Sequence, residues 1–178
     1  MDRRFLSAFT DPSDQVKILG RRVAPFSLLH RVQLEAIESP LLREGAEVRP
    51  SDLLVAVKIC AGEPIGKPTL KDSWHLGRMN RSEVYFVRQM VRFSEFVLLE
   101  SWPKFWEKKD KSRDTSGIPW PLTVVAGLIR NGLSEERAWT MPESQAIWLH
   151  SAFAVGHGAD LKVLTHEDEE LLAKLETA

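Results

Sequence analysis

The chain has 178 residues, of which 43% are hydrophobic and 28% are charged, and its formal net charge is −1. This length suits one domain, or one domain with a small helical appendage, and such a chain buries enough surface to fold without a disulfide or a metal. The near-zero charge argues against an electrostatic grip on nucleic acid over the whole surface, and no apolar run approaches the roughly 18 residues that span a bilayer.

The first segment, residues 1–61, predicts an N-terminal arm followed by a pair of helices. Residues 1–24 mix charges with Pro12 and Gly20, which is typical of an irregular arm or a short strand pair. They lack the apolar core of a signal peptide, so we expect a protein of the cytosol or of an intracellular assembly. Residues 26–38 place apolar side chains at helical spacing and predict the first helix of the pair.

The second helix of the pair is predicted over LLVAVKICA, with Ser51 or Asp52 as its N-cap. This segment is apolar nearly all round, so we expect it to lie centrally. It contains the only cysteine, Cys60, whose apolar surroundings favour a small buried side chain over a reactive thiol. Two Gly and two Pro then predict a loop at residues 62–69.

A central long helix is predicted within residues 70–103, with its strongest pattern at residues 81–100. Its polar side carries Arg81, Arg88 and Arg92. Its apolar side is predicted to be the broad face formed by Val84, Val87, Met90, Val91 and Val97, enlarged by Phe86, Phe93 and Phe96. A charged surface loop is predicted next, at residues 106–117.

Residues 118–178 predict a C-terminal module of helices with clear start and stop signals. Asn131-Gly132 predicts the end of one helix, and Ser134 caps the next. Pro142 opens a longer apolar helix that ends at Gly156, and Thr165 caps the last one, with Asp168 three residues later. The fold class expected from the whole chain is therefore mainly α. It comprises about seven helices in one compact domain or two small ones, and a short β-hairpin near the N-terminus is one alternative.

No arrangement of residues in the sequence indicates catalysis, a cofactor or a metal. The five histidines form no HExxH pair or Cys/His cluster, and no serine lies in a GxSxG elbow. The acidic run that follows His166 is explained by the positive end of a helix dipole. We therefore predict a non-enzymatic protein with no catalytic, cofactor-binding or metal-binding residues.

The tryptophans are the candidate contact residues, because Trp is enriched at interface centres as well as in cores. Trp120, Trp139 and Trp148 are predicted to be mainly core residues, whereas Trp102 and Trp106 beside the charged loop are assigned equally to core and surface. The candidate partner-binding residues are Trp102, Trp106, Trp139, Met141 and Trp148.

A second surface combines basic and aromatic residues, as single-stranded nucleic acids require. It consists of Arg78, Arg81, Arg88 and Arg92 with the nearby Trp74 and Tyr85. A simple polar helix face explains the same residues, so nucleic-acid binding is the less favoured interpretation.

The stretch PWPLTVVAGLIRNGLSEERAWTMPESQAIWLHSAFAVGHG, followed by LTHEDEELLAKL, resembles the C-terminal region of tailed-phage tail assembly chaperones. The similarity lies mainly in residues 118–175. Its elements are Gly132-Leu133-Ser134 opening a short helix, Trp139 followed by Met141-Pro142, and an apolar helix that ends near Gly156. A weaker similarity to small phage tail proteins lies in FSLLHRVQLEAIESPL.

This resemblance implies a small helical helper that acts in the host cytoplasm. Its partners would be the tape measure protein and the tail tube protein, and a homo-oligomer is compatible with it. Amphipathic helices with aromatic anchors suit such a role, because they cover apolar stripes of a long partner until other subunits replace them. The alternatives are a structural virion component, such as a head–tail connector or tail completion protein, and a nucleic-acid-binding regulator.

Overall fold

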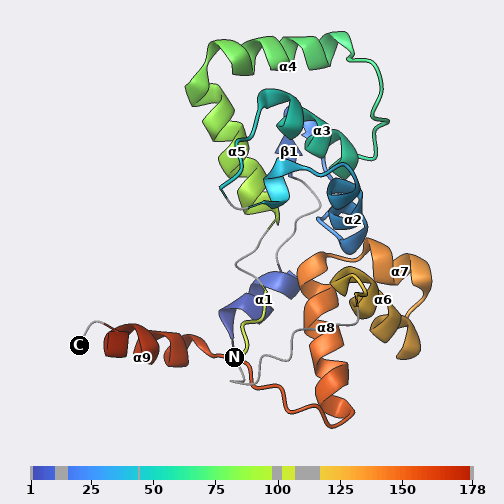
Figure 1. Ribbon diagram of the computed structural model, residues 1–178, viewed down its shortest axis with the longest axis vertical. Coiled ribbons are helices and arrows are strands. Elements are labelled where there is room, and N and C mark those ends of the chain that lie inside the picture. The colour runs from blue at the N-terminus through green and yellow to red at the C-terminus, as the bar shows by residue number, and fades with distance from the viewer. Residues whose placement is uncertain (1, 11–15, 44, 98–101, 107–116, 177–178) are drawn as a thin grey trace. The chain divides into compact units, whose positions relative to one another are not determined.

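The computed structural model describes residues 2–10, 16–43, 45–97, 102–106 and 117–176 (Figure 1). The chain divides into two compact units, the middle unit (residues 12–99) and the terminal unit (residues 1–11 and 100–178). Within the described ranges it forms nine α-helices and one two-stranded antiparallel sheet near the N-terminus. The predicted fold class, mainly α with a short hairpin, is confirmed. Most of the loop predicted at residues 106–117 lies outside the described residues.

The structure has two helices more than the sequence predicts. The helix α1 (Arg3–Thr10) occupies part of the segment for which the sequence predicts an irregular arm or a strand pair. The helix α4 (Leu70–Arg81) occupies the first part of the segment predicted to hold one long helix. The apolar pattern of the sequence does not predict either helix. The helix α1 has barely two turns, and α4 carries Gly77 and few apolar side chains.

The middle unit is built around one central helix. Its elements are β1 (Lys17–Ile18), β2 (Arg21–Arg22), α2 (Leu28–Ala36), the 3-10 turn η2 (Pro40–Leu42), α3 (Pro50–Cys60), α4 and α5 (Glu83–Val97). As its apolar sequence predicts, α3 lies at the centre and packs against α2, α4 and α5. Its side chains Leu53, Ala56 and Val57 are fully buried.

The predicted N-cap of α3 is wrong by two or three residues. The helix begins at Pro50, with Arg49 as the N-cap instead of Ser51 or Asp52. Proline suits a first helical position because its missing N–H has no intrahelical partner there. The Asp52 carboxylate then accepts a hydrogen bond from the backbone N–H of Arg49 at 2.8 Å, and this bond fixes the start.

The segment predicted as one central long helix contains two helices, α4 and α5. Thr69 starts α4: its hydroxyl accepts a bond from the N–H of Asp72 at 3.2 Å, and the Asp72 carboxylate accepts one from the N–H of Thr69 at 2.8 Å. The helix ends at Ser82, which adopts an extended backbone. The chain bends sharply between the two helices (Figure 1).

The predicted apolar face of α5 is correct for its phenylalanines, Met90 and Val97, which lie in or against the core, but wrong for three of its valines. The buried side chains are Gln89, Phe93 and Phe96, whereas the valines at positions 84, 87 and 91 are 49% to 71% exposed. Burying a phenylalanine removes more apolar area from water than burying a valine, so the helix turns its phenylalanines inward. The ring of Phe96 meets that of Phe26 edge-to-face at 6.0 Å.

The terminal unit contains α1, α6 (Trp120–Arg130), α7 (Glu135–Thr140), α8 (Glu143–Gly156) and α9 (His166–Glu176). The predicted boundaries are confirmed. Gly132, in the left-handed region at φ +94°, follows the end of α6, and the Ser134 hydroxyl accepts a bond from the N–H of Arg137 at the start of α7. At the start of α9, the Asp168 carboxylate accepts bonds from the backbone N–H and the hydroxyl of Thr165 at 2.9 and 2.7 Å.

The helix α1 packs against α8, far away in the sequence. The ring of Phe5 lies edge-to-face with that of Trp148 at 5.6 Å. The Gln145 amide donates a hydrogen bond to the carbonyl oxygen of Ala8 at 2.9 Å. The terminal unit is therefore assembled from both ends of the chain, which the pattern of the sequence in chain order does not predict.

The helices α6 and α8 approach closely at Gly127. A methyl group at this position would lie 2.5 Å from Nδ1 of His150 on α8, closer than real contacts allow. We expect Gly127→Ala to lower the free energy of unfolding by about 1 kcal/mol, because the cost of overpacking exceeds the gain in helix propensity. Urea denaturation measures the loss. In a His150→Ala background the same substitution is expected to stabilise, and a loss of equal size in both backgrounds would contradict the contact.

Candidate protein-binding surfaces

The five predicted partner-binding residues all belong to the terminal unit, but they differ in exposure. Met141 is only 4% exposed and packs inside the unit at the end of α7. Trp102, Trp139 and Trp148 are half-buried, and Trp148 holds α1 through Phe5. Of the five, only Trp106 is exposed.

The prediction that Trp120 is a core residue is wrong, since 39% of it is exposed. It is the first residue of α6, so only part of its ring meets another element. Its ring lies at 5.7 Å from that of Trp102, in a near edge-to-face arrangement. Trp102 and Trp148 therefore make contacts within the unit, which weakens the case for either as a partner anchor.

Trp106 lies beside a short antiparallel pairing of two segments. The backbone N–H of Trp106 donates to the carbonyl oxygen of Lys162 at 3.0 Å, and that of Leu164 donates to the carbonyl oxygen of Lys104 at 2.8 Å. These bonds fix the backbone while leaving the Trp106 side chain open to a partner. Of the five predicted partner-binding residues, Trp106 is therefore the best placed to contact a partner.

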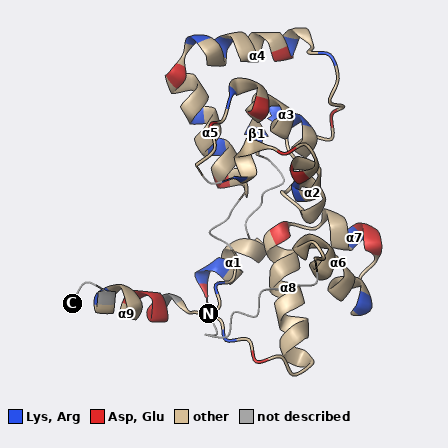
Figure 2. Cartoon of the chain, in the orientation of Figure 1, with Lys and Arg blue, Asp and Glu red and all other residues tan. Residues whose placement is uncertain are grey.

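The predicted basic and aromatic residues lie on α4 and α5 of the middle unit, where Figure 2 shows the basic positions in blue. The guanidinium of Arg78 lies 4.1 Å from the ring centre of Tyr85 and 5.3 Å from that of Trp74. Arg81, Arg88 and Arg92 are exposed, and none of these four arginines forms an ion pair within the described part of the chain. We call these four arginines the arginine edge.

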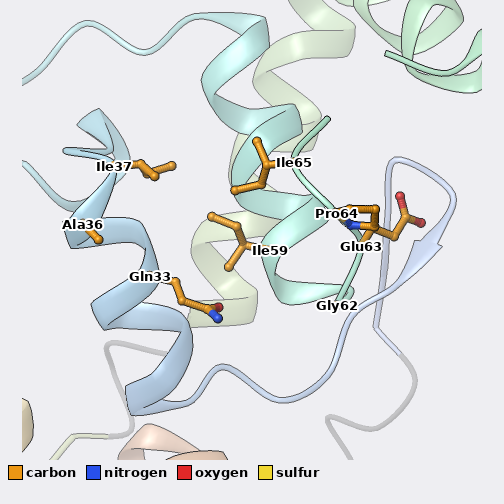
Figure 3. Close-up of a pocket in the computed structure, with 8 residues that line it drawn as sticks. All are labelled: Gln33, Ala36, Ile37, Ile59, Gly62, Glu63, Pro64 and Ile65. Carbon is orange, nitrogen blue, oxygen red and sulfur yellow. The ribbon is translucent and has the colours of Figure 1, made fainter. Parts of the chain in front are cut away.

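An apolar hollow of about 500 Å³ opens on the middle unit between α2 and the loop that follows α3 (Figure 3). One wall carries Gln33 and Ala36 from α2 and Ile37, which follows the end of that helix. The other carries Ile59 from α3 and the loop residues 62–65. Ile37 is 45% exposed and Ile65 is 57% exposed, so two large aliphatic side chains border the opening. The hollow can therefore accept an apolar side chain from another molecule.

A buried ionic cluster supports this loop. Arg21 bonds the Asp72 carboxylate and also donates from Nε to the Glu63 carboxylate at 2.8 Å. The other Asp72 oxygen lies 3.4 Å from Nζ of Lys58. Since Arg21, Lys58 and Asp72 are all buried, the cluster ties the hairpin, α3 and α4 together and anchors the wall of the hollow at Glu63.

The cluster makes the middle unit sensitive to acid. Burial alone would raise the pKa of Asp72, but hydrogen bonds with Thr69 and the charge of Arg21 outweigh burial and lower this pKa from 3.8 to about 2. Because the pKa of Asp72 is lower in the folded than in the unfolded chain, its carboxylate stabilises the fold at pH values above the ordinary pKa of 3.8. That stability is lost as the pH falls toward 2. We expect urea denaturation between pH 5 and pH 2 to show a steeper loss for the wild type than for Asp72→Asn. Parallel curves would contradict this contribution.

Two further side chains that can carry chemistry, Cys60 and His75, lie buried in the middle unit. Burial raises the pKa of the Cys60 thiol to about 12, so it stays protonated. His75 shares a hydrogen bond of 3.1 Å between Nδ1 and the Tyr85 hydroxyl, and burial followed by the charges of Arg21, Lys71 and Arg78 lowers its pKa. Among the residues that the structure describes, no group of His, Cys, Asp and Glu could hold a metal ion, and no helix is long and apolar enough to cross a membrane.

Sequence analysis misses the hollow, because its two walls come from segments that each look ordinary. The available signal is Ile65, a lone aliphatic residue in the loop GEPIGKPT. Ile37 is counted among the apolar positions of its helix, yet it lies beyond the end of α2. No protein-family model, curated protein or solved structure matches the chain.

Proposed function

We propose that this chain is a non-enzymatic binding protein that shields an apolar segment of a partner, and that its specific role is that of a phage tail assembly chaperone. The observation that carries the binding role is the hollow bordered by Ile37 and Ile65. The tail-assembly role rests on the resemblance of residues 118–175, which names the tape measure protein and the tail tube protein as partners in the host cytoplasm.

In this proposal, a helix of the partner inserts an apolar side chain between the two isoleucines. Gln33 and Glu63 lie at the same hollow, so polar groups of the partner backbone or its flanks also find hydrogen-bonding partners. Recognition of an amphipathic helix by an apolar groove works in this way. A shallow site of this kind gives modest affinity, and many copies along a long partner raise the total strength while each contact stays reversible.

The test is co-expression with a tape measure protein, the partner that the resemblance implies. We expect the wild type to co-purify with that protein and to raise its soluble fraction. The double variant Ile37→Asp with Ile65→Asp should reduce recovery of the partner at least tenfold, because two charges enter the apolar hollow. The matched control is Val155→Asp, since Val155 is 50% exposed on α8 and outside the hollow. Equal recovery of the partner with the wild type, the double variant and the control variant would exclude the hollow as the binding site.

The alternative to a chaperone is a structural component of the virion, and purified phage particles distinguish the two roles. A chaperone leaves the assembly, so it is absent from purified particles, whereas a connector or completion protein remains in them. Mass spectrometry of purified particles decides between the two roles. Stoichiometric presence of this chain would replace the chaperone proposal with the structural one.

A nucleic-acid-binding role has one observation in its favour, the arginine edge beside Trp74 and Tyr85. Binding through this surface would weaken steeply with salt, because arginines release counterions from phosphates. A fluorescently labelled single-stranded oligonucleotide, titrated at low and physiological salt, measures this dependence. Undetectable or salt-independent binding removes the role.

A further inference from the structure

The last helix, α9, carries an apolar surface that its own unit leaves uncovered. Leu171 is 58% exposed and Leu175 is 74% exposed, and the two lie one turn apart, with Leu172 beside them. The capping bonds between Thr165 and Asp168 specify the start of the helix. Isolated helices of about this length are only marginally stable in water. The exposed leucines of α9 therefore indicate that another surface covers them and stabilises the helix.

The first turns of α9 are strongly acidic (Figure 2). Residues 166–176 contain five acidic residues and one lysine. Glu167 lies one turn before Leu171 and therefore beside the leucines. Glu169 is held within the terminal unit by Lys104 at 2.7 Å and Arg4 at 3.3 Å, so the base of the helix is fixed while its leucines remain open. The surface is an apolar patch with an acidic border.

The helix α5 carries the matching surface. Val84, Val87 and Val91 follow the spacing i, i+3, i+7, so they form one continuous row along the helix. All three are exposed, at 49% to 71%. Arg88 and Arg92 lie along one side of the row, and the stacked Arg78 adjoins them through Tyr85. Exposed Glu83 and Glu95 lie near the two ends of the row, so the surface is an apolar row with basic residues along one side.

We propose that α9 of one copy docks on the valine row of α5 in a second copy. Leu171 and Leu175 would pack between the valines, and Glu167 would pair with the arginine edge. Each surface supplies what the other lacks: aliphatic contacts in the centre and opposite charges at the border. A reciprocal exchange, in which each copy offers one α9 and one α5, closes as a two-fold dimer and strengthens two modest contacts.

An acidic amphipathic helix fits the α5 surface better than a nucleic acid does. Single strands bind through stacking on aromatic rings and exposed arginine planes. Here the centre of the surface is a row of valines, which offer no flat ring. The one stacked arginine, Arg78, already has Trp74 and Tyr85 as its partners. This self-docking does not depend on the proposed function, because it uses neither wall of the hollow.

The test is sedimentation velocity of the full chain over a wide concentration range. We expect a concentration-dependent monomer–dimer equilibrium that weakens with salt. Val87→Asp on α5 and Leu175→Asp on α9 should each raise the dissociation constant at least tenfold. Leu122→Asp is the matched control, since Leu122 is 47% exposed on α6 and belongs to neither surface. Circular dichroism of each variant checks that the helices are retained.

Mixing the two disrupted variants tests whether α9 docks on α5 of a second copy or on α5 of its own chain. Val87→Asp retains an intact α9, and Leu175→Asp retains an intact α5, so one good contact remains in the mixture. We expect labelled Leu175→Asp to bind Val87→Asp but not itself. No binding between them at 100 times the wild-type dissociation constant would overturn the proposal, as would a monomeric wild type at all concentrations. Association that disappears after nuclease treatment would assign the surface to nucleic acid and overturn it too.

Discussion

Replacing Asp72 with Asn is expected to lower the free energy of unfolding by about 3–5 kcal/mol. The substitution removes one partner of a buried ion pair and leaves the charges of Arg21 and Lys58 without their shared carboxylate, which is the costly way to break such a pair. Asn keeps the shape of the side chain, so the loss reports charge and hydrogen bonding more than volume. Urea denaturation followed by circular dichroism measures it.

The matched control for this substitution is Asp52→Asn in the neighbouring helix α3. Asp52 also accepts a bond at a helix start, from the N–H of Arg49, but it is only partly buried and has no ion pair in the described structure. Asn keeps an amide oxygen that can accept this bond, so only the negative charge at the helix start is lost, which is expected to cost less than about 1 kcal/mol. Losses of equal size at the two positions would show that Asp72 acts only as a helix cap.

Replacing Leu128 with Ala is expected to lower the free energy of unfolding by about 3 kcal/mol. Leu128 is fully buried on the side of α6 that faces the core of the terminal unit, so the substitution removes apolar contacts and leaves a cavity. The same substitution at Leu122, which is 47% exposed on the same helix, should change the stability by less than about 0.5 kcal/mol.

The comparison of these two leucines tests the orientation of α6 directly. Thermal denaturation followed by circular dichroism measures both variants under one condition. If Leu122→Ala proved the more destabilising, the inward face of α6 would be assigned wrongly, and the contact between Gly127 and His150 would be assigned wrongly with it.

Local signals in the sequence predict the helix boundaries of the terminal unit well. Gly132, Ser134, Pro142 and Thr165 each act through a hydrogen bond or a backbone angle of their own neighbourhood, so no distant contact overrides them. Where the outcome depends on distant contacts, prediction fails. The face of α5 is the clearest case, because only the surrounding phenylalanine contacts decide that the valines turn outward.

The candidate binding surfaces were predictable only in part. The chemistry of the tryptophans makes them candidates, but Trp102 and Trp148 have ring partners inside the terminal unit, and Met141 is buried. The hollow between Ile37 and Ile65 depends on two segments meeting in space. The meeting of Arg78 with Tyr85 likewise follows from the bend between α4 and α5, which the prediction of a single helix conceals.

The packing of α1 on α8 also constrains how the protein is made. Ala8 and Gln145, which share a hydrogen bond, are 137 residues apart. During translation the middle unit is complete while α8 has yet to emerge from the ribosome, so that unit can fold first. Through that interval Phe5 lacks its ring partner on α8, Trp148. The terminal unit can form only after synthesis has passed Trp148.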